Sequence, residues 1–260
     1  MKAKQVLMAN LIVLAVAATQ VSCVRHLESL PFSDGKTVTE VRNIRNFEKI
    51  EINGSPSVYY TQADTFSVKV KGPESLIEEI ITEREGETLK IRNRGKVGVF
   101  NFSFDGGESA AVYVTSPDLI DVRLNGSGDF VCDRRLDTDN IKLVVRGSGD
   151  LSVTDLISDR CDVELVGSGD IHIENLEAKE VSAVLIGSGD IDLNLRNVAD
   201  TRLALKGSGD IDAVFEEGCQ SVDCELNGSG DIDLKGRIGQ IKSKKRGSGD
   251  INIANLTIEK

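Results

Sequence analysis

Residues 185–193 run Leu-Ile-Gly-Ser-Gly-Asp-Ile-Asp-Leu, and the Gly-Ser-Gly-Asp at their centre occurs seven times in the 260-residue chain. Its copies follow one another at steps of 19 to 21 residues and begin at Gly126, Gly147, Gly167, Gly187, Gly207, Gly228 and Gly247. A repeat of this length is too short to bury its own apolar face and must stack on its neighbours. The second half of the chain therefore predicts a repeat architecture.

Apolar residues occupy every second position on both sides of each copy. Around Gly187 they are Ala183 and Leu185 before the turn and Ile191 and Leu193 after it. Alternation of period two is typical of half-buried strands. Each repeat thus predicts a strand, a tight turn, a second strand and a corner, and stacked repeats give an all-β parallel solenoid with rungs about 4.8 Å apart. A run of antiparallel hairpins satisfies the same alternation but leaves the fixed repeat length unexplained.

The repeated turn supplies structural candidates, because glycine permits positive φ angles and aspartate hydrogen-bonds the local backbone. The first copy is Gly126, Ser127, Gly128 and Asp129, and the later aspartates are Asp150, Asp170, Asp190, Asp210, Asp231 and Asp250. Stacked carboxylates form a ladder whose oxygen atoms could hold calcium. A solvated ladder costs only about 1 kcal/mol per neighbouring pair, so it needs no cation. We expect turn capping, with no metal and no cofactor.

The repeated serines are weak candidates for a nucleophile, since a nucleophilic serine needs a base and an orienting group. The chain has two histidines, His26 near the N-terminus and His172 in an outward strand position. A carbohydrate-active enzyme is an alternative, because β-solenoids include polysaccharide lyases that combine calcium-bound carboxylates with a basic residue. The pattern places no basic cluster beside the aspartate ladder, and we expect no catalytic residues.

An outward column five residues before each turn glycine supports the stacking. Its members are Asp121, Lys142, Asp162, Ser182, Arg202, Asp223 and Lys242. Opposite charges in this column often fall one repeat apart, which predicts cross-strand pairs that each contribute a few tenths of a kcal/mol.

The last repeat departs from the pattern. Ser243 and Lys245 stand where the other repeats have apolar residues, inside the basic stretch Lys242-Ser243-Lys244-Lys245-Arg246. A basic patch can bind anions. Terminal repeats are atypical, however, and lysine on an edge strand blocks edge-to-edge pairing. We therefore expect a protected edge at this end.

The N-terminus predicts export. Lys2 and Lys4 precede an apolar run from Val6 to Ala18, so residues 1–22 have the pattern of a secretory signal peptide that is too short to span a membrane. Ser22-Cys23 indicates bacterial lipoprotein processing, with Cys23 as the candidate lipidation site. Cleavage after Ala17 without lipidation is the alternative.

Residues 23–42 are polar and predict a tether. We expect one domain over residues 43–260, with an irregular part at 43–117 and regular repeats at 118–260. Apolar alternation around Gly54-Ser55-Pro56-Ser57 predicts an eroded first repeat. A short helix is predicted after Pro73, reaching Ile81, because apolar residues there recur at helical spacing.

Composition excludes some partners. The formal net charge is −11, and loss of Lys2 and Lys4 with the signal peptide takes it to −13. An acidic protein repels nucleic acid and anionic lipid, so we expect no nucleic-acid partner and membrane contact only through a lipid anchor. The four cysteines after Cys23 are Cys132, Cys161, Cys219 and Cys224. Their spacing does not match a metal site, and their disulfide state stays open.

Exposed aromatic residues are the candidate binding surface. Phe100, Phe102 and Phe104 share one face of a predicted strand, where they either cover the N-terminal end of the core or form an exposed patch. Tyr59, next to the core-facing Tyr60, is a second candidate.

The repeated motif, Phe47-Glu48-Lys49-Ile50-Glu51-Ile52-Asn53-Gly54 and Val114-Thr115-Ser116-Pro117-Asp118-Leu119 together resemble the auto-transporter adhesin, head GIN domain family over roughly residues 45 to 258. The resemblance implies a right-handed parallel β-helix with the Gly-Ser-Gly motif at the turn between its sheets. It also implies an exported bacterial protein, often of the Bacteroidetes, with a role in adhesion at the cell surface. It carries over no catalytic residues.

We therefore expect an exported, non-catalytic β-solenoid that binds a surface or envelope ligand, either protein or glycan. Its expected location is the outer membrane or cell surface as a lipoprotein, or the periplasm. The alternatives are a polysaccharide lyase-like enzyme and an envelope structural or stress-related module.

Overall fold

The Gly-Ser-Gly-Asp turns stack because only glycine fits against the turn beneath. Gly187 has a φ of 145°, which L side chains rarely adopt. A Cβ atom on Gly189 would lie 1.8 Å from the carbonyl oxygen of Gly169 in the preceding rung. The Ser188 N–H donates a 2.9 Å hydrogen bond to the Gly167 carbonyl. Successive turns are thus held together by close backbone contact.

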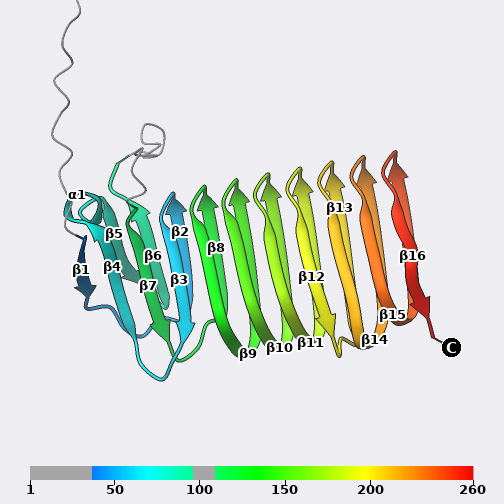
Figure 1. Ribbon diagram of the computed structural model, residues 1–260, viewed down its shortest axis with the longest axis horizontal. Helices are drawn as coiled ribbons and strands as arrows, with labels where there is room; N and C mark the ends of the chain where they lie inside the picture. Colours follow the sequence, from blue (N-terminus) through cyan, green and yellow to red (C-terminus); the bar gives the residue numbers. More distant parts are fainter. Residues whose placement is uncertain (1–36, 96–108, 260) are drawn as a thin grey trace, which may run out of the picture. The chain divides into compact units, whose positions relative to one another are not determined.

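The structure, a computed structural model, describes residues 37–95 and 109–259, which lie in one compact unit spanning Lys36–Lys260. Its rungs consist of β8 (Asp121–Gly126), β9 (Asp129–Gly147), β10 (Asp150–Gly167), β11 (Ile171–Gly187), β12 (Ile191–Arg196), β13 (Asp200–Gly207), β14 (Ile211–Gly228), β15 (Ile232–Gly247) and β16 (Ile251–Ile258). Every pairing among these strands is parallel (Figure 1). The predicted right-handed parallel β-helix is therefore confirmed, and the antiparallel hairpin alternative is wrong for these rungs.

The apolar columns lie in register inside the solenoid. Ile171 is opposite Ile191, and Ile191 is opposite Ile211. These three side chains and Leu185 are fully buried and belong to one continuous hydrophobic cluster. Burying such a side chain contributes about 1.5–3 kcal/mol, so the stacked columns are the main source of stability.

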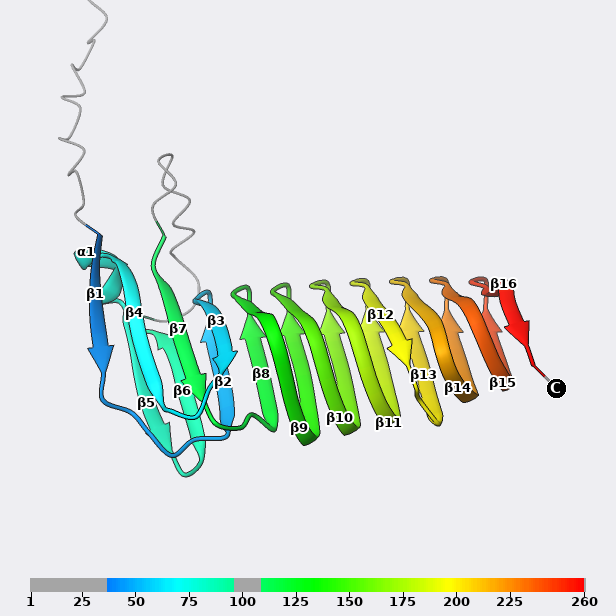
Figure 2. The same cartoon turned by 60° about the horizontal axis from the view of Figure 1, so that its bottom comes forward.

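Each rung contributes to two sheets (Figure 2). The strand segments that follow the turns form the post-turn sheet, in the order β1-β4-β7-β3-β9-β10-β11-β12-β14-β15-β16. The segments that precede the turns form the pre-turn sheet, in which β5, β6 and β2 continue into β8 and the second halves of the long strands. Long strands such as β10 bend through the corner and so belong to both sheets.

The eroded first rung consists of β2 (Lys49–Gly54) and β3 (Ser57–Gln62). β2 pairs in parallel with β8, and Gly54 lies opposite Gly126, as the eroded repeat predicts. β6 (Thr88–Asn93) and β7 (Ala111–Ser116) stack on β2 and β3 in parallel. Antiparallel strands then close this end: β4 (Ser67–Pro73) on β7, β1 (Thr37–Arg42) on β4 and β5 (Ile80–Glu85) on β6.

Two expectations for this part need correction. Residues 37–42, expected within the tether, form β1, because they pair with β4 and Val38 packs against the core. The helix α1 covers only Glu74–Ile77. Ile80 and Ile81 instead begin β5 opposite Asn93 and Arg92, since β-branched residues favour a paired strand over a short helix.

Candidate functional site

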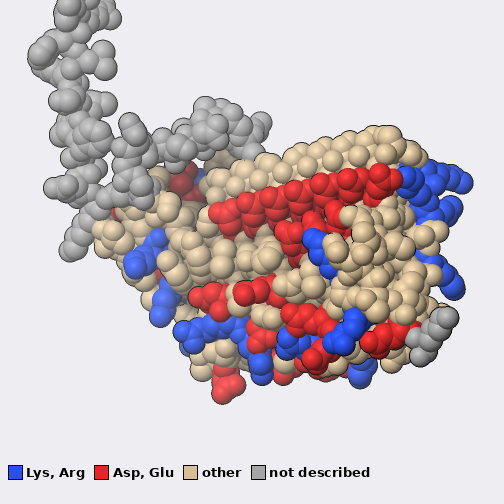
Figure 3. All heavy atoms as spheres, turned by 45° about the vertical axis from the view of Figure 1, so that its right-hand side comes forward, with Lys and Arg blue, Asp and Glu red and all other residues tan. Residues whose placement is uncertain are grey.

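The turn aspartates form a continuous row, visible as the line of acidic side chains beside the turns in Figure 3. The Asp170 carboxylate accepts a 3.0 Å hydrogen bond from the backbone N–H of Asp190, whose own carboxylate accepts one of 3.0 Å from Asp210. The same bond joins Asp150 to Asp170, Asp210 to Asp231 and Asp231 to Asp250. From Asp150 to Asp231, each carboxylate therefore holds the backbone of the next rung.

Hydrogen bonds and an ion pair hold the aspartate row, so it requires no cation. At its first member, Asp129 accepts a 2.9 Å bond from the Ser57 hydroxyl, and at its last, Asp250 pairs with Lys245 at 2.5 Å. Within residues 37–95 and 109–259, no group of three or more His, Cys, Asp or Glu side chains is arranged to hold a metal ion. Calcium binding at this row stays a hypothesis.

A second acidic column lies beside the first on the post-turn sheet. His172, Asp192, Asp212 and Asp233 are in register on successive rungs. Partial burial and the neighbouring Asp212 charge raise the pKa of the Asp192 carboxyl, although His172, 3.7 Å away, opposes the shift. Lys235 pairs with Asp212 at 3.2 Å. One basic residue thus contacts this column, a contact that the sequence pattern does not predict.

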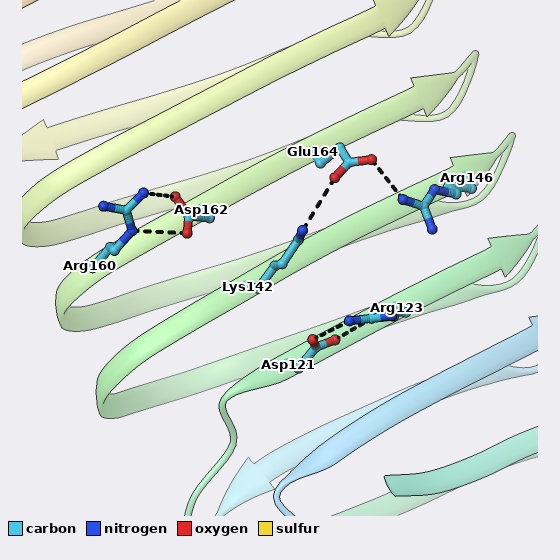
Figure 4. A network of polar contacts seen from close by, with 7 residues as sticks. All are labelled: Asp121, Arg123, Lys142, Arg146, Arg160, Asp162 and Glu164. Carbon is cyan, nitrogen blue, oxygen red and sulfur yellow. Dashed lines mark hydrogen bonds and ion pairs between the residues drawn. The ribbon is translucent and has the colours of Figure 1, made fainter.

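The charged column of the pre-turn sheet has the predicted register but other ion pairs (Figure 4). Asp121, Lys142 and Asp162 are cross-strand neighbours. Lys142 instead reaches Glu164 diagonally at 3.5 Å, while Arg123 pairs with Asp121 and Arg160 with Asp162 within the same strand, each at 2.9 Å. Residues two apart on a strand face the same side, so a bidentate arginine satisfies each aspartate locally.

Tyr59 stacks on a partner that the sequence did not reveal. Tyr59 on β3 and Tyr113 on β7 are opposite each other in the ladder, with ring centroids 5.3 Å apart and ring planes at 17°. Tyr59 is 42% exposed and Tyr113 is 41% exposed, so the pair is an aromatic platform at the surface. The alternation Val112-Tyr113-Val114 marks an outward tyrosine. Only the pairing of β3 with β7 places it beside Tyr59.

The tyrosine pair belongs to one outward column that crosses the whole post-turn sheet. In ladder order its members are Val41, Lys69, Tyr113, Tyr59, Val131, Ser152, His172, Asp192, Asp212, Asp233 and Asn252. The column is aromatic and apolar near the N-terminal strands and acidic toward the C-terminal rungs. The two halves of one face therefore offer different chemistry.

Two shallow grooves of about 350 Å³ each follow the corner of the rungs. Both include Arg160, and each mixes acidic and basic side chains, such as Asp200 and Arg202 in one and Asp139 and Lys142 in the other. Ion pairs already engage Arg160 with Asp162 and Glu180. The mixed charges give neither groove a preference for one class of ligand.

The described residues do not assemble a nucleophile. Burial raises the pKa of the Cys161 and Cys224 thiols to about 12 and that of Cys132 to about 11, so these thiols stay protonated at neutral pH. Cys219 is also buried, and all four are free. The turn serines carry no hydrogen bond to a histidine in the described ranges, where His172 faces Asp192 instead.

Several sequence-predicted residues lie outside the described residues: the signal peptide over 1–22, Cys23, His26, and the candidate binding residues Phe100, Phe102 and Phe104. Among the residues that are described, no helix has the length and apolar character needed to cross a membrane.

Comparison with known proteins identifies the fold. A crystal structure described as a putative adhesin from Bacteroides fragilis is 24% identical, has a TM-score of 0.74 and covers 86% of this chain and 97% of its own. A "putative adhesin" from Parabacteroides distasonis is 18% identical, with a TM-score of 0.68 over 87% of this chain and 98% of its own. A "putative lipid binding protein" from the same organism is 22% identical, with a TM-score of 0.65 over 84% and 98%.

None of the curated proteins compared with this chain matches it. A family model described as "Putative auto-transporter adhesin, head GIN domain" matches residues 46–219 and 194–260. These two matches cover the rungs, the eroded first turn and, apart from β1, the strands that close the N-terminal end. The chain belongs to the auto-transporter adhesin, head GIN domain family.

Proposed function

We propose that this protein is an exported, non-catalytic adhesion or ligand-binding protein whose post-turn sheet contacts its ligand around Tyr59 and Tyr113. The stacked, exposed tyrosine pair is the observation that supports this most strongly. Large aromatic side chains are enriched at interfaces because they combine an apolar ring with a polar hydroxyl. Isolated exposed aromatics are common, but two that stack in one outward column make a platform.

The surroundings of the pair favour binding. Lys69 follows Tyr113 in the outward column, and Val131 follows Tyr59 on the other side. The platform therefore has a basic and an apolar neighbour in this column, whose acidic members begin at Asp192 farther along the sheet. The strands that carry it are hydrogen-bonded on both sides, which keeps the platform rigid and limits the entropy lost on binding.

We propose no catalytic activity for two chemical reasons. Buried thiols with raised pKa values make poor nucleophiles, and the turn aspartates are engaged with the backbone. The family is described as an adhesin, which fits a binding role. Export through the signal peptide at residues 1–22 and anchoring at Cys23, at the cell surface or outer membrane, complete the proposal.

The proposal is tested with a glycan and host-matrix binding array probed with the mature protein. Tyr59→Ala/Tyr113→Ala should weaken capture at least about tenfold, since interface aromatics commonly contribute more than about 1 kcal/mol each. The matched control is Ser152→Ala/His172→Ala, in the same outward column two and three strands farther along. Equal binding by both variants would remove the platform from the proposal.

Two further outcomes would redirect the assignment. Release of unsaturated products from acidic polysaccharides would indicate a lyase-like enzyme, with Lys235 beside Asp212 as the first basic residue to substitute. Specific co-purification of an envelope protein, without binding to any glycan or matrix component, would indicate an envelope module.

A further inference from the structure

Among the residues that the structure describes, half of the strand β15 has a neighbouring strand on one side only. Residues 240–247 of β15 pair with β14 on one side, whereas β16 pairs only with the earlier residues of β15, from Ile232 to Ile238. Among the described residues, the other side of 240–247 therefore carries backbone groups with no strand partner. Such an edge is a template for an added strand. We call residues 240–247 the basic edge.

The basic edge has a strong positive charge on an acidic protein. Lys242, Lys244, Lys245 and Arg246 are all exposed, and basic side chains gather at this end in Figure 3, where the acidic row stops. Lys244 pairs with Glu225 at 3.2 Å and Lys245 with Asp250 at 2.5 Å. In the described part of the chain, no carboxylate lies within ion-pair distance of Lys242 or Arg246.

The chain itself shows which strand fits this edge. On the paired side, Asp223 lies opposite Lys242 and Glu225 lies opposite Lys244. An acidic strand with carboxylates at alternate positions thus already packs against the lysines. Opposite charges at cross-strand positions stabilise a sheet, and like charges destabilise it. The open side presents the same lysines to any further strand.

Polar residues occupy the inward positions of the basic edge, which favours the docking of a separate strand over a further rung of the same chain. Ser243 lies opposite Cys224 and Lys245 opposite Leu226, so polar residues replace the apolar columns at this point. Both are exposed, unlike the buried residues of the columns that they continue. An added strand would meet a polar surface here, which suits a reversible contact.

We propose that the basic edge docks an extended acidic polypeptide segment, which adds as a strand beside residues 240–247 and sets its carboxylates against Lys242, Lys244 and Arg246. The lysines repel the same edge of a second copy and attract an acidic strand. This site is separate from Tyr59 and Tyr113 and does not depend on the proposed function.

The probe is a labelled peptide with the sequence of residues 221–228 carrying Cys224→Ser, which is Ser-Val-Asp-Ser-Glu-Leu-Asn-Gly. Fluorescence anisotropy with the full mature chain should show binding that weakens as salt is raised, because exposed charges are screened. A peptide with both acidic residues replaced by lysine should bind at least about tenfold more weakly, since its charges repel the edge. A peptide N-methylated at alternate amides, which keeps its charge but cannot pair, should lose binding similarly.

The matched protein variants separate the edge from general charge. Lys242→Glu/Arg246→Glu should weaken binding at least about tenfold. Arg202→Glu/Lys206→Glu, in the same two columns two rungs earlier on a strand paired on both sides, should leave it unchanged. The neutral pair Lys242→Gln/Arg246→Gln should give a smaller loss. Circular dichroism and the thermal midpoint confirm that each variant is folded.

Four outcomes would overturn the proposal. They are an equal loss in both charge-reversed variants, undiminished binding of the N-methylated peptide, capture of polyphosphate or anionic vesicles without capture of the acidic peptide, and concentration-dependent self-association through this edge. Either of the first two outcomes would mean that the peptide binds through a non-specific charge effect. The last two would assign the edge to a polyanion or to a second copy.

Discussion

The turn of the first rung, Gly54-Ser55-Pro56-Ser57, differs from the regular turns in the atoms that lie against its first glycine. A Cβ on Gly128 would lie 2.2 Å from the Pro56 carbonyl oxygen, and one on Gly126 would lie 2.2 Å from that of Gly54. At Gly54 itself the nearest atom is only the side-chain oxygen of Asn93, at 2.3 Å. The second glycine of the motif is therefore required by the turn beneath it, whereas the first rung has Pro56 at the equivalent position.

Asn93 provides an acceptor at the place where each regular turn uses a carbonyl of the turn beneath it. Its side-chain oxygen accepts a 2.9 Å hydrogen bond from the Ser55 N–H. In the next rung the Gly54 carbonyl accepts the equivalent bond, also of 2.9 Å, from Ser127. Among the described residues, a side chain and antiparallel strands thus cover the first rung, while residues 240–247 keep an open edge that carries basic side chains. Four sets of substitutions test this contrast.

The largest effect is expected in the apolar columns. Leu185→Ala removes a fully buried side chain and should lower the free energy of unfolding by about 4 kcal/mol. Lys245 stands in the same column in the last rung but is exposed. Lys245→Ala should therefore lower the free energy of unfolding by less than about 0.5 kcal/mol. Chemical denaturation measures both. Similar losses would mean that the last rung is packed like the others.

Glycine at the turn should come next. Gly189→Ala places a Cβ against the Gly169 carbonyl and should lower the free energy of unfolding by about 3 kcal/mol, because the rungs must separate to admit it. Gly86→Ala, in the β5–β6 turn, has a φ of 60° but open space around it, and should cost about 1 kcal/mol. A Gly189→Ala protein as stable as Gly86→Ala would contradict the steric account of the repeat.

The aspartate row should contribute less per residue. Asp190→Ala removes the acceptor for the Asp210 N–H, and we expect a loss of about 1 kcal/mol in the free energy of unfolding. Asp190→Asn keeps an acceptor oxygen and should lose less. Ser57→Ala, at the equivalent position of the first rung, removes a hydroxyl that donates to Asp129 and serves as the comparison. If calcium raises the thermal midpoint of the wild type but not of Asp190→Ala, the row binds a cation after all.

The smallest effect is the pH dependence that arises from Asp192 in the regular rungs. The pKa of Asp192 is raised in the folded protein, so the folded state binds its proton more tightly than the unfolded state does. The stability that this carboxyl contributes is present below its ordinary pKa and is lost as the pH rises through the raised value. Asp192→Asn should therefore be stabilised relative to wild type at neutral pH, by a few tenths of a kcal/mol for so exposed a group. Denaturation curves of both proteins at pH 3 and pH 7 measure this difference, and a stability advantage of Asp192→Asn that shrinks as the pH rises would contradict it.

Much of the regular part was predictable because its signals are local or periodic. The motif around Gly187 and the alternation of Leu185 and Ile191 recur at one period, so any neighbouring rung supplies the same partner. The irregular end has no such redundancy. Thr37 pairs with Pro73, and Ser55 depends on Asn93, which is 38 residues away. Nothing in the local pattern of either residue indicates its partner.

The candidate binding surface shows the same division. Tyr59 was identifiable from its place beside the core-facing Tyr60, whereas its stacking on Tyr113 required the parallel pairing of β3 and β7. The charged column was predictable as a column, but its ion pairs were not, because long arginine side chains reach the acid on their own strand first. The backbone pairing sets which residues lie opposite each other. The length and position of each side chain then decide which of the nearby charges it contacts.

The sequence alone determined the period, the glycine-rich turn and the alternating columns, because a 20-residue unit that cannot bury its own apolar face has to stack on another. The tertiary structure alone decided how the stack begins and ends: which strands reverse direction over the first rung, which side chain supports the first turn, and which half-strand has no strand partner among the described residues. Those outcomes depend on contacts between residues far apart in the chain, and such contacts are specific to each end because neither end repeats.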